Sequence, residues 1–195
     1  RLIELLDLWP SERSLQLNPP EQRQAIDRWR EQLQGPVNDG VYRCGFARNQ
    51  DAYNGAEEAF WATLASIEEL LRQPSDAEPS AAGEEDRGAE GPWLAGGSTP
   101  SLADVQLFPT LVRLELVYGP LFGVSRRPLW QLPALWQWRR RFFSLPGVAS
   151  TCFPEAWRRD YFGALFPLHP SGIIPAGPEL SSLLSGTPPP GGHPP

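Results

Sequence analysis

Tyr42 and Arg43 are adjacent residues whose side chains could bind an aromatic ligand at the wall of a cleft. A phenol is a flat apolar ring that ends in a polar hydroxyl, so it can stack on a ligand ring while its oxygen forms a hydrogen bond. The pair follows Gly40 in a segment expected to be a loop, and this setting suits a cleft better than a core. Burial of Tyr42 in the core is the alternative interpretation.

Cys44 is the side chain most able to act as a nucleophile, because Arg43 beside it favours the reactive thiolate. No second cysteine stands at CxxC spacing, and His169 and His193 lie too far along the sequence to be assigned as a base. We therefore predict that Cys44 is inert, that Cys152 packs against apolar residues, and that the chain holds no catalytic residue of its own. Two cysteines and two histidines give no zinc-binding spacing, so no metal is expected.

The composition is that of a globular protein kept in a reducing compartment. A chain of 195 residues with 41% hydrophobic residues can bury a core without disulfides. No stretch reaches the roughly 18 uncharged apolar residues that a membrane span needs, and residues 2–8 do not resemble an export signal. We expect a cytoplasmic protein with no membrane partner.

The net charge of −6 is concentrated in one segment. Residues 73–91 are rich in acidic residues, proline, serine, alanine and glycine and have no apolar period, so we expect a disordered acidic loop. The predicted organisation is a lead-in over 1–20, a helical domain over 21–178 that contains this loop, and a flexible Pro/Gly-rich tail over 179–195.

Apolar residues recur every three or four positions in several segments, which predicts amphipathic helices. The strongest pattern covers 56–71; others cover 21–33, where Gly35 and Pro36 are expected to stop the helix, 133–144 and 153–162. A further helix should begin at Ser101, because Ser101 and Asp104 have the spacing of a capping box. No alternating strand pattern is present, so we expect an all-α fold of about five helices.

Arginines and tryptophans interleave in the second half of the chain, a combination that also occurs on nucleic-acid-binding surfaces. No known nucleic-acid-binding motif accompanies them, so we expect a solvated helix surface and no nucleic-acid partner. The arginines are Arg126, Arg127, Arg139, Arg140, Arg141, Arg158 and Arg159.

Residues 93–109, which read WLAGGSTPSLADVQLFP, resemble the loop, capped helix and buried aspartate of the C-terminal domain of glutathione transferases. The segments 38–47 and 161–178 resemble more narrowly the glutathionyl-hydroquinone reductases, the Xi class of these enzymes. The resemblance implies a helical bundle of the glutathione transferase C-terminal type. It also implies a separate thioredoxin-like domain, for which the residues before Glu21 leave no room.

The resemblance implies that Tyr42 and Tyr161 face the ring of a glutathionylated hydroquinone, with Arg43 beside them. Glutathione would be the cosubstrate, bound mainly by the thioredoxin-like domain in cis or in trans, and this family commonly forms homodimers. Phe162 stands where the family usually has a second tyrosine, which affects the expected substrate preference. The alternative hypothesis is a non-catalytic helical module that binds partner proteins.

Overall fold

The computed structural model describes residues 16–73, 91–165 and 168–184, and every regular element in these ranges is helical. The expected all-α fold is thereby confirmed. The acidic loop predicted over 73–91 lies almost entirely outside the described residues. The elements are α2 (Arg23–Leu33), η1 (Gln34–Asn38), α3 (Gly40–Gly45), α4 (Gln50–Arg72), α5 (Leu102–Val112), η3 (Leu114–Tyr118), α6 (Gly119–Phe122), η4 (Leu129–Gln131), α7 (Pro133–Phe143), η5 (Ala149–Thr151), α8 (Pro154–Ala164) and α9 (Leu180–Leu184).

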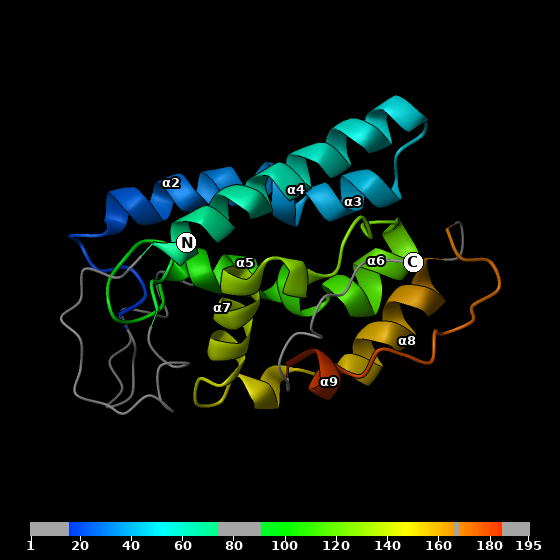
Figure 1. The fold of residues 1–195 in the computed structure, drawn as a ribbon. Coiled ribbons are helices and arrows are strands. Elements are labelled where there is room, and N and C mark those ends of the chain that lie inside the picture. Colours follow the sequence, from blue (N-terminus) through cyan, green and yellow to red (C-terminus); the bar gives the residue numbers. More distant parts are fainter. Residues whose placement is uncertain (1–15, 74–90, 166–167, 185–195) are drawn as a thin grey trace.

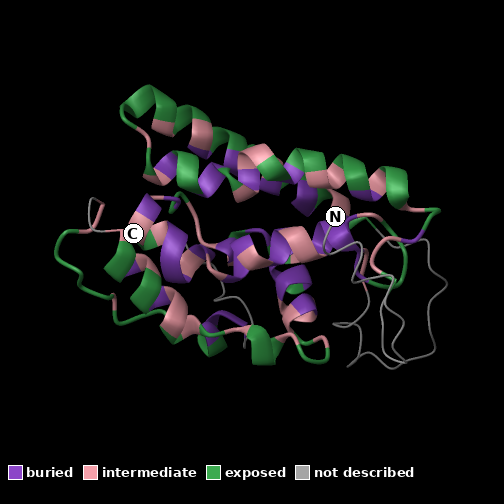
Figure 2. Cartoon of the chain, turned by 180° about the vertical axis from the view of Figure 1, so that it is seen from behind, coloured by how far each residue is buried: buried purple, intermediate pink, exposed green. Residues whose placement is uncertain are grey.

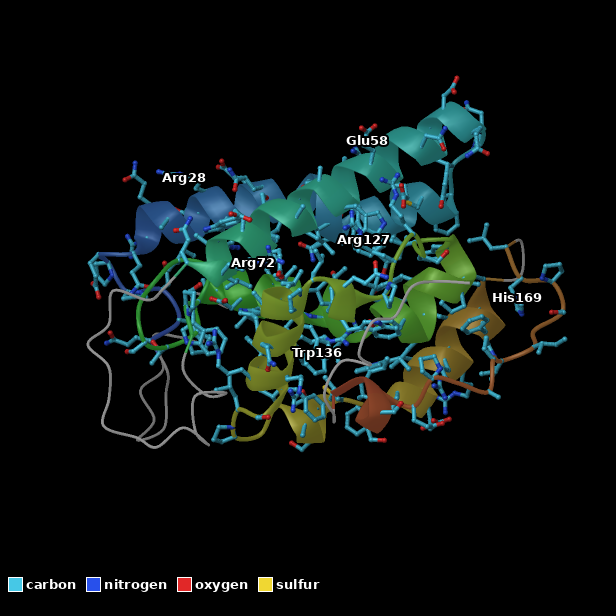
Figure 3. All side chains as sticks on the ribbon, in the orientation of Figure 1. Arg28, Glu58, Arg72, Arg127, Trp136 and His169 are labelled. Carbon is cyan, nitrogen blue, oxygen red and sulfur yellow. The ribbon has the colours of Figure 1, made fainter. Side chains whose placement is uncertain are left out.

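The helices form stacked layers around one core. Helices α2, α3 and α4 lie together on one side, α5 and α6 lie beneath them, and α7, α8 and α9 complete the opposite side (Figure 1). Buried residues face the space between the layers, and exposed residues such as Arg28 and Glu58 point outward from the first layer (Figures 2 and 3). Helix α5 is therefore the central element, because most of its residues are buried.

Helix α4 confirms the strongest pattern in the sequence but begins six residues earlier than predicted. Its buried stripe includes Phe60, Leu64 and Ile67, each fully buried. The helix starts at Gln50 because Asn49 Oδ1 accepts a hydrogen bond from the Ala52 amide at 2.8 Å. The first turn is largely exposed, so it carries no apolar period from which its helical structure could be predicted.

The segment after α2 is helical, and the prediction of a loop there is wrong. Helix α2 ends at Leu33, as the sequence predicts, but Gly35 and Pro36 lie inside η1, a π-helical turn closed by the hydrogen bond from Asp39 N–H to Gln34 O at 2.8 Å. Tyr42 follows in α3 rather than in a loop. Pro36 has no N–H to donate along the helix, and it lies where the hydrogen bonding changes from the α-helical to the π-helical pattern.

Ser101 and Asp104 form the capping box at the start of α5. Asp104 is fully buried, and its Oδ2 accepts hydrogen bonds from the Ser101 amide at 2.9 Å and the Ser101 hydroxyl at 2.7 Å. Its Oδ1 accepts from the Leu94 amide at 3.1 Å and from Trp138 Nε1 at 2.9 Å. One carboxylate therefore connects the loop before α5, the N-terminus of α5 and α7.

Residues 180–184, placed in a flexible tail by the sequence analysis, instead form α9 with Leu180, Leu183 and Leu184 buried. Trp136 on α7 joins this helix to α9 (Figure 3), because its indole Nε1 donates to Leu183 O at 3.0 Å. A pattern of three leucines in five residues is too short to predict a helix from periodicity alone. Residues 185–195 of the predicted tail lie outside the described residues.

Candidate functional site

Three tyrosines from separate parts of the chain meet at one point. The hydroxyls of Tyr42 on α3 and Tyr161 on α8 are 2.6 Å apart, and the hydroxyl of Tyr118 at the end of η3 is 3.2 Å from that of Tyr161. Tyr161 is thus the middle member of a chain of three phenols. The structure brings together Tyr42 and Tyr161, which are 119 residues apart in sequence.

Two phenylalanines complete the aromatic cluster. The Phe122 ring stacks on the Tyr118 ring at 5.7 Å between centroids, and its centroid lies 5.4 Å from that of Tyr42 and 6.3 Å from that of Tyr161. The ring centroid of Phe46 lies 5.7 Å from that of Phe122. We use the name aromatic cluster for Tyr42, Phe46, Tyr118, Phe122 and Tyr161.

The aromatic cluster has a buried end and an exposed end. Tyr118 and Phe122 are 2% and 3% exposed, whereas Tyr42 and Phe46 are 38% and 50% exposed. Exposed rings at these two neighbouring positions are costly unless another molecule or domain covers them. The exposed end can therefore receive a flat apolar ligand, with hydroxyl groups already present beside it.

Burial raises the pKa of two phenols of the cluster, Tyr42 and Tyr118. Burial, with the hydrogen bond to Tyr161 as the next cause, raises the pKa of Tyr42 above its ordinary value. Burial also raises the pKa of Tyr118, and its hydrogen bond to Tyr161 acts in the same direction. Both phenols are protonated at neutral pH, as an ordinary tyrosine is, and the partly exposed Tyr42 hydroxyl can donate a hydrogen bond to a ligand oxygen.

A groove of about 780 Å³ runs beside the exposed end of the cluster. Tyr42, Arg43 and Phe46 line it from α3, while small residues such as Gly55 and Ala59 line it from α4. Tyr42 and Arg43 therefore share one wall, as residues of a binding surface should. Tyr161 is not part of this lining and reaches the wall only through the hydroxyl of Tyr42.

Tyr118 is the tyrosine of the cluster that sequence reasoning missed, and the two phenylalanines were not predicted as site residues either. It ends the run Leu114–Tyr118, in which Leu114, Leu116, Val117 and Tyr118 are all buried. An aromatic residue in such an apolar run is normally interpreted as core. The run also forms a π-helical turn, so its side chains do not follow the α-helical period that the sequence analysis used.

The residues considered for nucleophilic or metal chemistry lie elsewhere. Cys44 is buried, Cys152 is partly buried and packs against the core, and His169 Nε2 lies 2.7 Å from Ile173 O in the loop after α8. His193 lies outside the described residues. Within the described ranges, no three His, Cys, Asp or Glu side chains are grouped so that they could hold a metal ion.

Cys44 is expected to react slowly with alkylating agents in the folded chain. Burial, with the nearby Glu57 as a second cause, raises the pKa of the Cys44 thiol to about 11. At pH 8 only about one molecule in a thousand would carry the thiolate, and this fraction grows as pH rises toward 11. Iodoacetamide should therefore modify Cys44 at least about tenfold more slowly in the folded chain than in urea.

A Cys152→Ser variant isolates this thiol, and peptide mass spectrometry at several pH values gives its rate. Equal rates in the folded and unfolded chains would contradict the burial and raised pKa of Cys44.

The arginines of the second half of the chain donate mainly within the molecule. The expectation that they form a solvated surface is wrong for Arg139 and Arg158, which are 1% and 4% exposed. Arg139 pairs with Glu115 at 2.6 Å, and Arg158 donates to Pro178 O. Other members of this set pair with Glu57 or lie over tryptophan rings: Arg126, Arg127, Arg140 and Arg141.

None of the helices in the described ranges combines the length and the apolar character needed to cross a bilayer.

Residues 50–141 match the family model for the glutathione S-transferase C-terminal domain. The chain is 34% identical over 160 residues to the glutathionyl-hydroquinone reductase PcpF of Sphingobium chlorophenolicum. This match covers 82% of this chain and 45% of that protein. It is 30% identical over 160 residues to the glutathionyl-hydroquinone reductase YqjG of Escherichia coli. This match covers 82% of this chain and 43% of that protein. The chain thus spans less than half the length of these two curated relatives.

Solved structures agree with this relationship. A glutathione transferase from Gordonia bronchialis gives a TM-score of 0.77 at 30% identity, over 94% of this chain and 52% of that one. The glutathione-bound structure of YqjG from E. coli gives a TM-score of 0.74 at 29% identity, over 86% of this chain and 49% of that one. The helical domain of this chain is a glutathione S-transferase C-terminal domain, and its relatives are the glutathionyl-hydroquinone reductases of the Xi class and omega-like glutathione transferases.

Proposed function

We propose that this chain forms the substrate pocket of a glutathione-dependent reductase that acts on glutathionylated hydroquinones. The observation that carries the proposal is the aromatic cluster, in which the partly exposed Tyr42 is hydrogen-bonded through Tyr161 to the buried Tyr118. The thiol nucleophile would come from a thioredoxin-like domain outside these 195 residues, in cis or in trans. Glutathione, abundant in the cytoplasm, would be the cosubstrate.

The proposed reaction has two steps, and its sulfur chemistry lies outside the described residues. A cysteine thiolate of the thioredoxin-like domain attacks the glutathionyl sulfur, so a mixed disulfide forms, the bond from that sulfur to the ring carbon breaks, and the carbon takes up a proton. A second glutathione thiolate then attacks the mixed disulfide, releasing oxidised glutathione and the cysteine thiolate. The hydroquinone is the reduced product, and two glutathione sulfurs are oxidised.

The helical domain would bind and orient the ring during this reaction. Tyr42 and Phe46 offer exposed aromatic surface on which a hydroquinone ring can stack. The partly exposed Tyr42 hydroxyl can donate a hydrogen bond to a ring oxygen, while Tyr161 and Tyr118 hold it from behind through their own hydroxyls. Arg43 lies on the same wall, where its guanidinium can pair with a glutathionyl carboxylate.

The test is to fuse the thioredoxin-like domain of the E. coli relative to the N-terminus of the full chain. The fusion should reduce glutathionyl-menadiol with glutathione, and the chain alone should show no turnover because Cys44 is buried and protonated. Turnover by the chain alone, lost in Cys44→Ser, would refute the assignment of the thiol to a second domain. A folded fusion with no activity would favour a partner-binding module instead.

A further inference from the structure

A polar network joins the π-helical turn η1 to α5. Asn38 Nδ2 donates to Gln106 O at 3.0 Å and to Thr110 Oγ1 at 2.8 Å, while Gln106 Nε2 donates back to Asn38 Oδ1 at 3.1 Å. Both ends of the Asn38 amide are therefore used. Thr110 is buried, so an Asn38 side chain that left this position would leave a buried hydroxyl without its donor.

The network holds both ends of the turn. Gln106 Nε2 also lies 3.1 Å from Arg30 O, the carbonyl at the end of α2 that accepts the Gln34 amide. Asn38 is the last residue of η1. Because Gln106 contacts the chain before the turn and Asn38 contacts α5 from the last residue of the turn, the two amides hold both ends of η1 against α5.

The position of Tyr42 depends on this turn. Tyr42 lies four residues after Asn38 in α3, a helix of six residues, and so short a helix is not stable in one orientation by itself. Its hydroxyl must nevertheless come within 2.6 Å of the Tyr161 hydroxyl. π-Helical turns are rare in proteins and occur frequently next to functional sites.

We propose that Asn38 and Gln106 are positioning residues, which hold η1 so that Tyr42 faces the substrate site. Neither side chain belongs to the aromatic cluster, so both act through the backbone that leads into α3. The functional meaning of the inference rests on the proposed function, but the placement of Tyr42 can be measured without any substrate.

The first test uses the four tyrosines of the chain, labelled with 3-fluorotyrosine and assigned with single Tyr→Phe variants. In Asn38→Ala, the ¹⁹F resonances of Tyr42 and Tyr161 should shift. The resonance of Tyr53, whose hydroxyl donates to Gly123 O, should stay in place. Unchanged Tyr42 and Tyr161 resonances in a folded Asn38→Ala chain would overturn the proposal.

Two more variants keep this test decisive. Thr110→Val has the shape of the native side chain and removes only one acceptor of Asn38, so it should shift the Tyr42 resonance in the same direction even if Asn38→Ala does not fold. Asn54→Ala is the matched control, because Asn54 is exposed and, among the described residues, its side-chain oxygen accepts a hydrogen bond from Gln50 alone. A Tyr42 shift as large in Asn54→Ala as in Thr110→Val would also overturn the proposal.

The second test is a double-mutant cycle in the two-domain fusion. Asn38→Ala should lower kcat/KM for glutathionyl-menadiol by about tenfold, because small misplacements of an orienting group are costly. On a Tyr42→Phe background, Asn38→Ala should cause little further loss. Equal losses on both backgrounds would overturn positioning through Tyr42. An inactive fusion would refute the proposed function, while the fluorine spectra would still decide the placement of Tyr42.

Discussion

Replacing Asp104 by alanine is expected to lower the free energy of unfolding by about 4 kcal/mol, because three N–H donors and a hydroxyl would lose their acceptor inside the fold. The loss is a large share of the roughly 5–15 kcal/mol that stabilises a typical domain, so the midpoint of thermal unfolding should fall by about 8–16 °C. It exceeds the usual value of a helix cap because Asp104 also accepts from Leu94 and Trp138, far from its own helix.

Urea denaturation followed by tryptophan fluorescence measures this effect. Asp51→Ala is the matched control, because Asp51 is an exposed acidic residue in the first turn of α4 and should cost less than about 1 kcal/mol. Losses of similar size in the two variants would contradict a central role for the buried carboxylate of Asp104.

Arg139→Met should lower the free energy of unfolding by about 3–5 kcal/mol, because it removes one partner of a buried ion pair. Arg139 Nη1 donates to Glu115 Oε2 at 2.6 Å and to Leu111 O at 3.0 Å, and Nη2 donates to Leu183 O at 3.3 Å. Without the guanidinium, the carboxylate of Glu115, 12% exposed, would lose its charge partner. The hydrogen bonds of Arg139 to Leu111 O on α5 and to Leu183 O on α9 would also be lost.

The double variant Arg139→Met with Glu115→Leu tests whether the unpaired charge of Glu115 causes this loss of stability. It should recover most of the stability, since a buried ion pair replaced by apolar side chains is often close to neutral. Arg159→Met serves as the control, because the Arg159–Asp160 pair is 70% and 64% exposed and contributes little. A double variant as unstable as Arg139→Met alone would show that the unpaired charge is not the cause.

The sequence was sufficient to predict the helices with long apolar stripes. Helix α4 was found because Phe60, Leu64 and Ile67 repeat on one face, and the start of α5 was found because Ser101 and Asp104 have capping spacing. Short helices such as α3 and α9 were missed, since five or six residues cannot display a period. Burial of charged groups such as Arg139 was missed because the pairing with Glu115 depends on tertiary contacts.

The site was predictable only in part, for a physical reason. Tyr42 and Tyr161 were singled out by resemblance, yet nothing in their spacing indicates that their hydroxyls meet. Tyr118 was hidden in an apolar run. Both η1 and η3 are π-helical turns that change which side of the chain the next residues face, and such turns have no simple sequence signature. The cluster therefore depends on geometry that α-helical periodicity does not predict.

The most direct test of the substrate pocket is the kcat/KM of the two-domain fusion for glutathionyl-menadiol after removal of single tyrosine hydroxyls. Tyr42→Phe and Tyr161→Phe should each lower kcat/KM by about tenfold or more, because each removes a hydroxyl from the chain of phenols that would bind the ring oxygens. Tyr53→Phe, which removes a hydroxyl bound to Gly123 O outside the cluster, should remain within about twofold of the unmodified fusion. Equal activity in all three variants would contradict the account, because the aromatic cluster would then not be the surface that binds the substrate.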